Sequence, residues 1–208
     1  DRAACKKSRR SHAPLSTGAP RCTSRPVSAD LPFDRSLRRI RRDRGARRFG
    51  EADYLHRMAA EELLERLSLV KRRFSDALIL GFPGLIREPL RAQGMNVTKA
   101  DAGALLAAEG IQCDEDRLPF GDGTFDLVIS VGVLDSVNDL PGALTLIRRA
   151  LRPDGLFLAA FAGAGSLPRL KSAMLGGDEA EGAATAARIH PQVDVRAAGD
   201  LLGRAGFA

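Results

Sequence analysis

Short apolar runs alternate with segments of helical hydrophobic period through most of the chain. The apolar runs predict strands at Ala77–Gly81, Asn96–Ala100, Ile111–Cys113, Phe125–Val131 and Leu156–Phe161. Between them, a helical period predicts helices at Ile86–Gln93, Ala102–Glu109 and Leu140–Leu151. Strands that alternate with helices in this way predict βαβ units, and therefore an α/β fold with a mostly parallel sheet.

Further helices are expected on both sides of this region. One runs from about Asp53 to Val70, with its apolar stripe at Leu55, Met58, Ala59, Leu63 and Leu67. The last runs over Val195–Ala205. Pro153-Asp154-Gly155 is expected to stop the preceding helix and to turn the chain into the last strand. From Asp34 to Phe49 arginine is dense, and like charges four residues apart repel each other on a helix.

Charge is distributed unevenly along the 208 residues, whose formal net charge is +6. Residues 1–50 hold 15 of the 32 Lys and Arg but only 4 of the 26 Asp and Glu, so the rest of the chain is mildly acidic. Aromatic residues are also scarce, with nine Phe, one Tyr and no Trp. The predicted domain therefore lacks both the charge and the stacking platform of a nucleic-acid binder, and no nucleic-acid partner is expected.

Composition divides the chain into three parts. Residues 1–31 are basic, almost free of acids and without hydrophobic period, which predicts a disordered tail, with a mitochondrial transit peptide as the alternative. Residues 32–52 form an Arg-rich lead-in segment, and residues 53–208 form the folded domain. Cys5, Cys22 and Cys113 match neither a metal site nor a disulfide framework, so we expect no metal and a reducing compartment. No apolar run approaches the roughly 20 residues of a membrane helix, which predicts a soluble protein.

The first candidate for chemistry is the interval from Gly81 to Asp101. A glycine turn after the first strand lets the backbone approach a nucleotide, and an acid about 20 residues later binds ribose hydroxyls. Asp101 follows the second predicted strand at that spacing, although an acid there could equally cap the next helix. The glycine loop is irregular, because Phe82 and Pro83 stand between Gly81 and Gly84 and Pro has no N–H to donate.

A second group of polar residues lies around the fourth predicted strand. Asp114 could accept the amino group of an adenine beside Glu115 and Leu118, or these acids could form a solvated loop. The loop after the strand is where substrate meets cofactor in a doubly wound sheet, and Asp135 there is a possible acceptor for a cationic substrate such as arginine. Asp139 is expected to cap the helix that begins at Leu140.

The block Asp114–Ser130, with Leu118-Pro119-Phe120 and Phe125-Asp126-Leu127-Val128, resembles class I S-adenosylmethionine-dependent methyltransferases. Further segments are similar to the respiratory complex I assembly factor family, in an alphaproteobacterial-type version, with the biotin-pathway malonyl-carrier-protein methyltransferase as a more distant relative. They are Leu31-Pro32-Phe33-Asp34-Arg35, Val137–Leu144, Leu151–Phe157, Gly165–Leu170, Arg188-Ile189-His190-Pro191 and Asp200–Phe207.

The resemblance implies a Rossmann-like fold, S-adenosylmethionine as cofactor, and a protein substrate that belongs to complex I. The residues placed at the cofactor are Gly81, Gly84, Asp101, Asp114, Glu115 and Ser130. Mitochondrial members imply arginine hydroxylation rather than methylation, and the sequence leaves both reactions open. A bacterial member implies a cytoplasmic location, with the mitochondrion as the alternative. The fold of this class closes with a β-hairpin after Gly206-Phe207, so we expect the given chain to lack it.

Two other functions are compatible with the pattern. A non-catalytic assembly chaperone would explain the irregular glycine loop, because such a protein has no need to bind the cofactor. A nucleic-acid methyltransferase would use the Arg-rich segment, and its binding would depend steeply on salt.

Overall fold

The computed structural model describes residues 31–182 and 189–208. Apart from Leu31, the expected tail lies outside the described residues, as does Arg188. Residues 31–208 form one compact unit, which therefore includes the Arg-rich lead-in segment.

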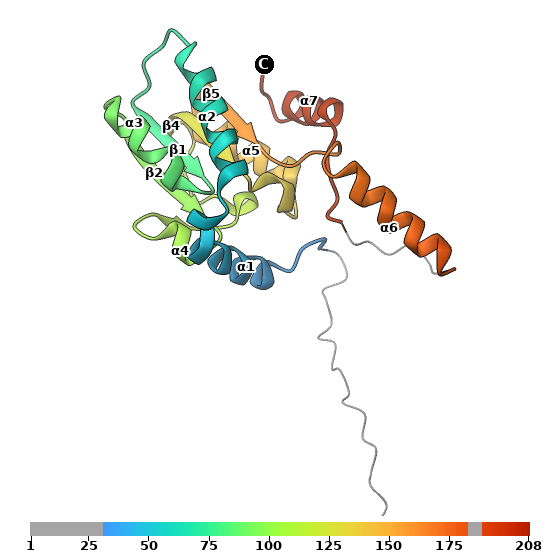
Figure 1. The fold of residues 1–208 in the computed structure, drawn as a ribbon. Helices are drawn as coiled ribbons and strands as arrows, with labels where there is room; N and C mark the ends of the chain where they lie inside the picture. The colour runs from blue at the N-terminus through green and yellow to red at the C-terminus, as the bar shows by residue number, and fades with distance from the viewer. Residues whose placement is uncertain (1–30, 183–188) are drawn as a thin grey trace, which may run out of the picture. The chain divides into compact units, whose positions relative to one another are not determined.

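A parallel five-stranded sheet forms the centre of this unit, in the order β3-β2-β1-β4-β5 (Figure 1). Its strands are β1 (Asp76–Leu80), β2 (Asn96–Asp101), β3 (Ile111–Gln112), β4 (Phe125–Val131) and β5 (Leu151–Ala160). The predicted α/β fold with a parallel sheet is confirmed. The chain moves outward from β1 to β3, then returns to β4 on the other side of β1. This reversal of direction is the place where open α/β sheets bind ligands, at the carboxyl ends of the strands.

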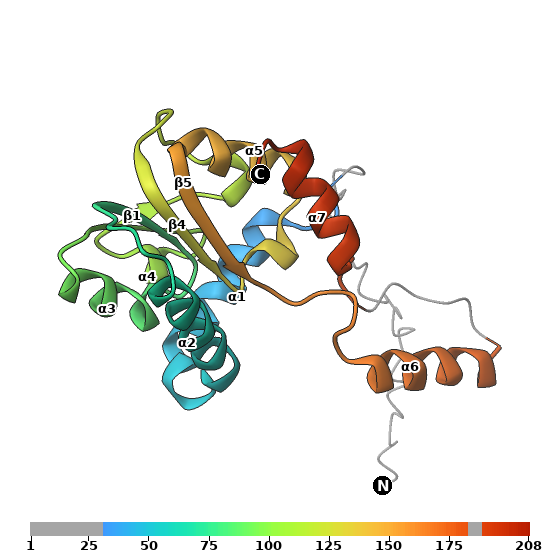
Figure 2. The same ribbon diagram turned by 90° about the horizontal axis from the view of Figure 1, so that it is seen from above.

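Helices cover both faces of the sheet (Figure 2). On β1, Leu78 and Leu80 pack into a core with α5 (Leu140–Ala150) and α7 (Val195–Arg204). Ala77 and Ile79 point to the opposite face, which packs against α2 (Tyr54–Ser68) and α3 (Arg87–Ala92). Side chains alternate between the faces of a strand, so one apolar run supplies both cores.

Two details of the helices differ from the prediction. Leu63 and Leu67 of α2 are buried as expected, but Leu55 and Met58 are 61% and 62% exposed. The buried side of α2 runs through Ala60, Leu63 and Leu67, with the half-buried His56 at its start, and Leu55 and Met58 lie off this side. The helix α6 (Pro168–Ala180) was not predicted, and it projects away from the sheet (Figure 1). The short helix α4 (Ala104–Ala107) covers only part of the predicted range.

The last strand also begins earlier than predicted. Leu151 already pairs with Phe125, and regular pairing resumes at Leu156 opposite Leu127 after an irregularity. The predicted turn residues lie inside this irregularity, where Asp154 has a φ of +62°. Asp139 caps α5 as predicted, because its side chain accepts a hydrogen bond from the Gly142 N–H.

The Arg-rich segment forms the helix α1 (Arg35–Arg48), contrary to the repulsion expected between its like charges. Asp34 caps its first turn by accepting from the Leu37 N–H. No residue of α1 is fully buried, so apolar packing contributes little to holding it in place. Its place beside the sheet comes from a set of ion pairs to the carboxyl ends of the strands.

Candidate functional site

A row of acids follows the carboxyl ends of β2 and β3. Asp101 is the last residue of β2, and the other three lie in and next to the 3₁₀ helix η3 (Glu115–Arg117). We call this set the acidic row: Asp101, Asp114, Glu115 and Asp116. Asp101, Asp114 and Glu115 are 1–3% exposed. Buried carboxylates require partners, since an unpaired buried charge is costly.

The helix α1 supplies those partners from one face, made by Arg35, Arg38, Arg39 and Arg42. These positions recur at the spacing that puts side chains on one side of a helix. Arg42 binds Asp101 with two hydrogen bonds, from Nε to Oδ1 at 2.7 Å and from Nη2 to Oδ2 at 2.5 Å. Arg39 donates to Asp114 at 2.7 Å. We call this side of the helix the arginine face.

The other two arginines complete the pairing. Arg35 binds both oxygens of Asp116 at 2.7 Å, and its Nη1 is 3.2 Å from Asp114. Arg38 Nη1 lies 2.8 Å from Glu115 Oε2, as an ion pair without good hydrogen-bond alignment. Burial raises the pKa of Glu115 despite the charge of Arg38. Burial also acts to raise the pKa of Asp116, but the hydrogen bond and charge of Arg35 outweigh it and the pKa is lowered.

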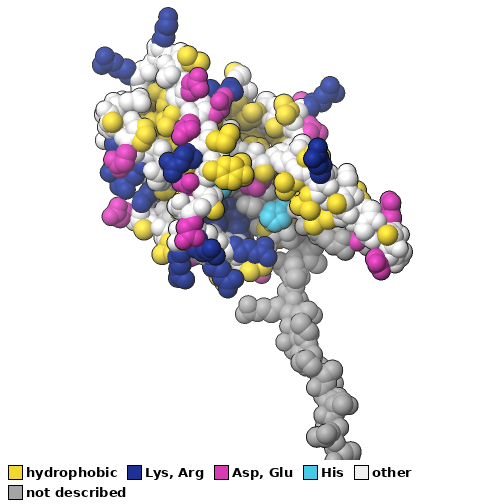
Figure 3. All heavy atoms as spheres, in the orientation of Figure 1, with side chains coloured by type: hydrophobic (Ala, Val, Ile, Leu, Met, Phe, Trp, Pro, Cys, Tyr) yellow, Lys and Arg dark blue, Asp and Glu magenta, His cyan; other side chains and the backbone are white. Residues whose placement is uncertain are grey.

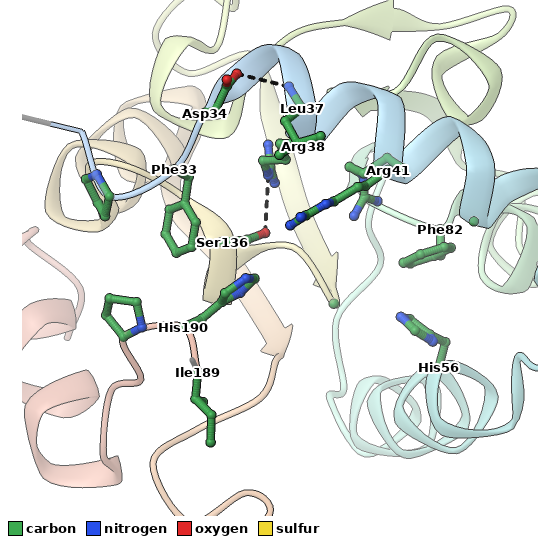
Figure 4. A pocket seen from close by; sticks show the side chains of 15 residues that line it. Phe33, Asp34, Leu37, Arg38, Arg41, His56, Phe82, Ser136, Ile189 and His190 are labelled. Atoms are coloured by element: carbon green, nitrogen blue, oxygen red, sulfur yellow. Dashed lines mark hydrogen bonds between the residues drawn. The ribbon is translucent and has the colours of Figure 1, made fainter. Parts of the chain in front are cut away.

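A cavity of about 700 Å³ opens beside the arginine face. Figure 4 shows α1 along one side of it, Phe82 and His56 at one end, and Ile189 and His190 at the other. Arg38 reaches the loop after β4, where it donates to Ser136 Oγ at 3.2 Å and to the Val133 carbonyl at 3.3 Å. Arg41 also lines the cavity. The cavity therefore lies at the switch point of the sheet.

Aromatic side chains fill the space around the glycine loop. Phe82 stacks on Phe49 with ring centroids 4.2 Å apart, and the His56 ring lies 4.1 Å away on a tilted plane. The Arg42 guanidinium carbon is 4.8 Å from the Phe82 ring centroid, within the range of a cation–π contact. Burial, followed by the charge of Arg42, lowers the pKa of His56, so its imidazole is neutral at pH 7.

Gly81 is required by the packing of this loop. Its φ is +78°, and a Cβ there would lie 2.5 Å from both the Val131 carbonyl oxygen and Val133 Cγ1. Gly84 is different, because it is exposed and an added Cβ would meet nothing within 4 Å. The irregular loop thus keeps one essential glycine at its start, directly after β1.

The six residues assigned to the cofactor fall into two groups. Asp101, Asp114 and Glu115 come together under α1, at the edge of the sheet. Gly81 is buried, and its N–H donates to the carbonyl of Ala100, the residue before Asp101. Gly84 is exposed. Ser130 is fully buried inside β4, with no hydrogen-bond partner for its Oγ among the described residues. Asp135 is half-buried and lines a smaller cavity of about 260 Å³ with Phe33 and Phe161.

The residues that sequence reasoning missed are those that line the large cavity. They are Phe33, Arg38, Arg41, Arg42, His56, Phe82, Ser136 and His190. The arginine face was visible in the sequence as arginines at i, i+3, i+4 and i+7, and the acids near the strand ends offered complementary charge. The pairing of these arginines with the acids could not be recognised locally, because the two segments lie about 60 to 80 residues apart. Arg42 and Asp101 are separated by 59 residues, and Arg35 and Asp116 by 81.

A family model described as a methyltransferase domain matches residues 80–159. The chain is 34% identical over 203 residues to the human mitochondrial arginine-hydroxylase NDUFAF5, covering 91% of this chain and 58% of that protein. It is 32% identical over 191 residues to the malonyl-[acyl-carrier protein] O-methyltransferase of Halorhodospira halophila, covering 84% and 62%. The chain thus spans about three fifths of the length of these curated relatives.

Solved structures share the fold. The putative methyltransferase bound to the Trm112 activator of Haloferax volcanii matches with a TM-score of 0.62 and 18% identity, over 81% of this chain and 75% of that one. Phosphoethanolamine N-methyltransferase 2 of Haemonchus contortus, a complex with S-adenosylhomocysteine, matches with a TM-score of 0.53 and 18% identity over 71% and 36%.

The parallel sheet, its acids at the strand ends and the matching domain model define the class of this protein. The chain belongs to the class I S-adenosylmethionine-dependent methyltransferase superfamily. Within that superfamily the chain is similar to the NDUFAF5 arginine-hydroxylases, at 34% identity to the human protein and 35% to that of Danio rerio.

S-adenosylmethionine is the cofactor that goes with this class of domain, and the site offers groups that fit it. Asp101 lies at the end of β2, Gly81 allows close backbone approach, and a cavity of about 700 Å³ lies alongside. One feature opposes the fit, because both Asp101 oxygens are already bound to Arg42.

Two further findings bear on partners. Within residues 31–182 and 189–208, no helix is long and apolar enough to cross a membrane. In the same part of the chain, no group of three or more His, Cys, Asp and Glu side chains could hold a metal ion. Cys113 is buried, and burial followed by the charges of Glu115 and Asp114 raises its pKa to about 12, so its thiol is protonated and unreactive.

Proposed function

We propose that this protein is an S-adenosylmethionine-dependent enzyme of the methyltransferase type that modifies a protein substrate in respiratory complex I assembly. The observation that carries the proposal is the acidic row at the carboxyl ends of β2 and β3, beside the switch point of the sheet. It places Asp101 and Asp114 at the carboxyl ends of neighbouring strands, next to a cavity large enough for a ligand of drug size. The similarity to arginine-hydroxylases supports a protein substrate.

In this proposal Asp101 accepts hydrogen bonds from the ribose hydroxyls, and Asp114 and Glu115 lie at the adenine. Gly81 lets the backbone approach the ligand, and Gly84 and Ser130 border it. Asp101 is well suited to a diol because a carboxylate offers two oxygens to two hydroxyl donors. This set serves methyl transfer and hydroxylation alike, since it holds the cofactor and leaves the reacting atom open.

Asp135 is the proposed contact to the substrate. It lies in the 3₁₀ helix η4 (Leu134–Ser136) directly after β4, where substrate and cofactor meet in this type of sheet. Its cavity also has the aromatic rings of Phe33 and Phe161 in its lining. A carboxylate and aromatic faces together suit a guanidinium group, which forms ion pairs and cation–π contacts.

Isothermal titration calorimetry with S-adenosylmethionine tests this proposal. We expect saturable binding to the parent chain. Asp122→Asn provides a control, because Asp122 is an exposed acid that forms an ion pair with the exposed Arg149, away from the acidic row. It should bind as the parent does. Absence of binding heat at millimolar S-adenosylmethionine would contradict the proposal that the protein is an enzyme that uses this cofactor.

A non-catalytic assembly chaperone is the second candidate, and the glycine loop specifically favours it. Phe82 occupies the loop and is held by Phe49 and His56, while Pro83 removes a backbone donor. These contacts stabilise the chain without a ligand. A chaperone of this kind would bind its protein partner with equal affinity in the presence and absence of S-adenosylmethionine, which pull-down with and without the cofactor would show.

A further inference from the structure

We propose that α1 and the cofactor compete for the acidic row, so that the arginine face must leave Asp101 before a ribose can bind there. This inference rests on the proposed function, because it assumes that the acidic row is the cofactor site. It makes α1 an internal inhibitor of cofactor binding. Competition has a structural basis in three parts: the occupancy of Asp101, the way α1 is attached, and the charge of the row.

The first part is that Asp101 has no capacity left for a diol. Its Oδ1 accepts from Arg42 Nε at 2.7 Å and from the Gly103 N–H at 2.7 Å, which uses both lone pairs of that oxygen. Its Oδ2 accepts from Arg42 Nη2 at 2.5 Å. Two ribose hydroxyls need one free position on each oxygen. The Gly103 contact is local and can remain, so Arg42 is the group that must move.

The second part is that α1 is attached by charge and not by a core. None of its residues is fully buried, and its apolar residues Leu37 and Ile40 are 41% and 49% exposed. Moving the helix away therefore exposes little apolar surface and leaves both layers of the sheet intact. The segment just before α1 has an independent anchor, because Asn138 accepts from the Phe33 N–H at 2.8 Å and donates to its carbonyl at 3.1 Å. Phe33 can thus remain in place while the helix beyond it moves.

The third part is the balance of charge. Four carboxylates face four guanidinium groups, so the row is neutralised while α1 is in place. Departure of α1 leaves four carboxylates, a set that attracts a sulfonium-bearing cofactor and can accept its hydroxyl and amino donors. The hydroxyl and amino donors of the cofactor then take the place of the guanidinium donors at these carboxylates. The acidic row therefore binds either α1 or the cofactor, and each can replace the other.

Four further arginines of α1, at positions 41, 44, 47 and 48, are exposed to solvent. Figure 3 shows Lys and Arg side chains gathered over this part of the surface. Arg44 forms no ion pair within the described residues, whereas Arg39, on the arginine face, pairs with Asp114 while its side chain is still 44% exposed. Arg39→Gln and Arg44→Gln make the same charge change on the same helix. Only the first weakens the hold on the acidic row.

Calorimetry on the full chain with S-adenosylhomocysteine as the probe compares these variants with the parent. Arg39→Gln should bind about tenfold more tightly, within the range of coupling seen between linked sites. Arg44→Gln should stay within twofold of the parent. Equal affinity of all three proteins overturns the competition but leaves the cofactor site of the proposed function standing. Absence of binding by all three overturns both.

Amide hydrogen exchange in the unsubstituted chain gives an independent result. Saturation with S-adenosylhomocysteine should accelerate exchange across Arg35–Arg48, while exchange in β1 and β4 is unchanged or slower. Slower exchange in α1 would show that the helix closes over the ligand as a cover, and unchanged exchange would show that the two do not interact. Either of these outcomes contradicts competition.

Discussion

Arg42 and Asp101 form a two-point ion pair across the carboxyl edge of the sheet, at 2.7 and 2.5 Å. Arg42 comes from a helix without buried residues, and Asp101 from the end of a central strand. The pair joins two roles in one carboxylate, since Asp101 holds α1 in place and is also the proposed acceptor for the ribose. Stability and ligand binding are therefore coupled at this residue.

Loss of the Arg42 side chain should lower the free energy of unfolding. Arg42→Met leaves the Asp101 carboxylate buried without its guanidinium, and breaking one partner of a buried pair costs about 3–5 kcal/mol. Urea denaturation should show that loss in the free energy of unfolding. Arg44→Met is the matched control on the exposed side of α1, with an expected change within about 0.5 kcal/mol. Equal effects of the two substitutions would show that the pair with Asp101 contributes nothing specific.

The glycine loop should tolerate a side chain at one position and not at the other. Gly81→Ala combines a left-handed backbone with a Cβ only 2.5 Å from the Val131 carbonyl. Strain and overpacking of this kind cost about 1–3 kcal/mol each, so we expect a loss of about 2–6 kcal/mol in the free energy of unfolding by urea. Gly84→Ala should change the free energy of unfolding by less than about 0.5 kcal/mol. A neutral Gly81→Ala would contradict the described path of the loop.

Acid should destabilise the protein in part through Asp116. Arg35 lowers the pKa of this carboxyl in the folded state, against the effect of burial. A carboxyl with a lowered folded pKa contributes stability above its unfolded pKa of about 3.9 and loses it as the pH falls through the folded pKa. The parent should therefore lose free energy of unfolding below about pH 4, and Asp116→Asn should lose less. Asp122→Asn, at an exposed pair, should follow the parent, and parallel profiles for the parent and Asp116→Asn would refute the assignment.

Much of the sheet could be predicted because its strands are buried on both faces. The run from Phe125 to Val131 is uninterrupted and apolar apart from Asp126 and Ser130, and all seven residues are buried. The predicted range for this strand agrees with the structure at both ends. Asp126 accepts from the N–H groups of Ser75 and Asp76, which explains an acid at the start of such a strand. Apolar runs of this type reveal strands from local sequence alone.

The arrangement at the site could not be predicted in the same way. Like charges three or four residues apart destabilise an isolated helix, so the arginines at positions 35, 38, 39 and 42 argue against one. This repulsion decides the outcome only where no acidic partner is present. The acids that overcome this repulsion lie 59 to 81 residues away in sequence. The exposed Leu55 and Met58 mislead for a related reason, because the side of α2 that packs on the sheet is set by the fold and passes through Ala60 instead. Both errors concern contacts that depend on the tertiary fold.

The affinity of Asp101→Ala for S-adenosylmethionine tests the central claim most directly. The parent chain, Asp101→Ala and Asp122→Ala are compared by calorimetry, with circular dichroism to verify the fold of each. Loss of the charge-assisted hydrogen bonds to the ribose should weaken binding to Asp101→Ala by about 1–3 kcal/mol. Asp122→Ala should bind as the parent does. Full affinity in Asp101→Ala would contradict the account, because Asp101 would then serve only as the anchor of Arg42 and the cofactor would bind elsewhere.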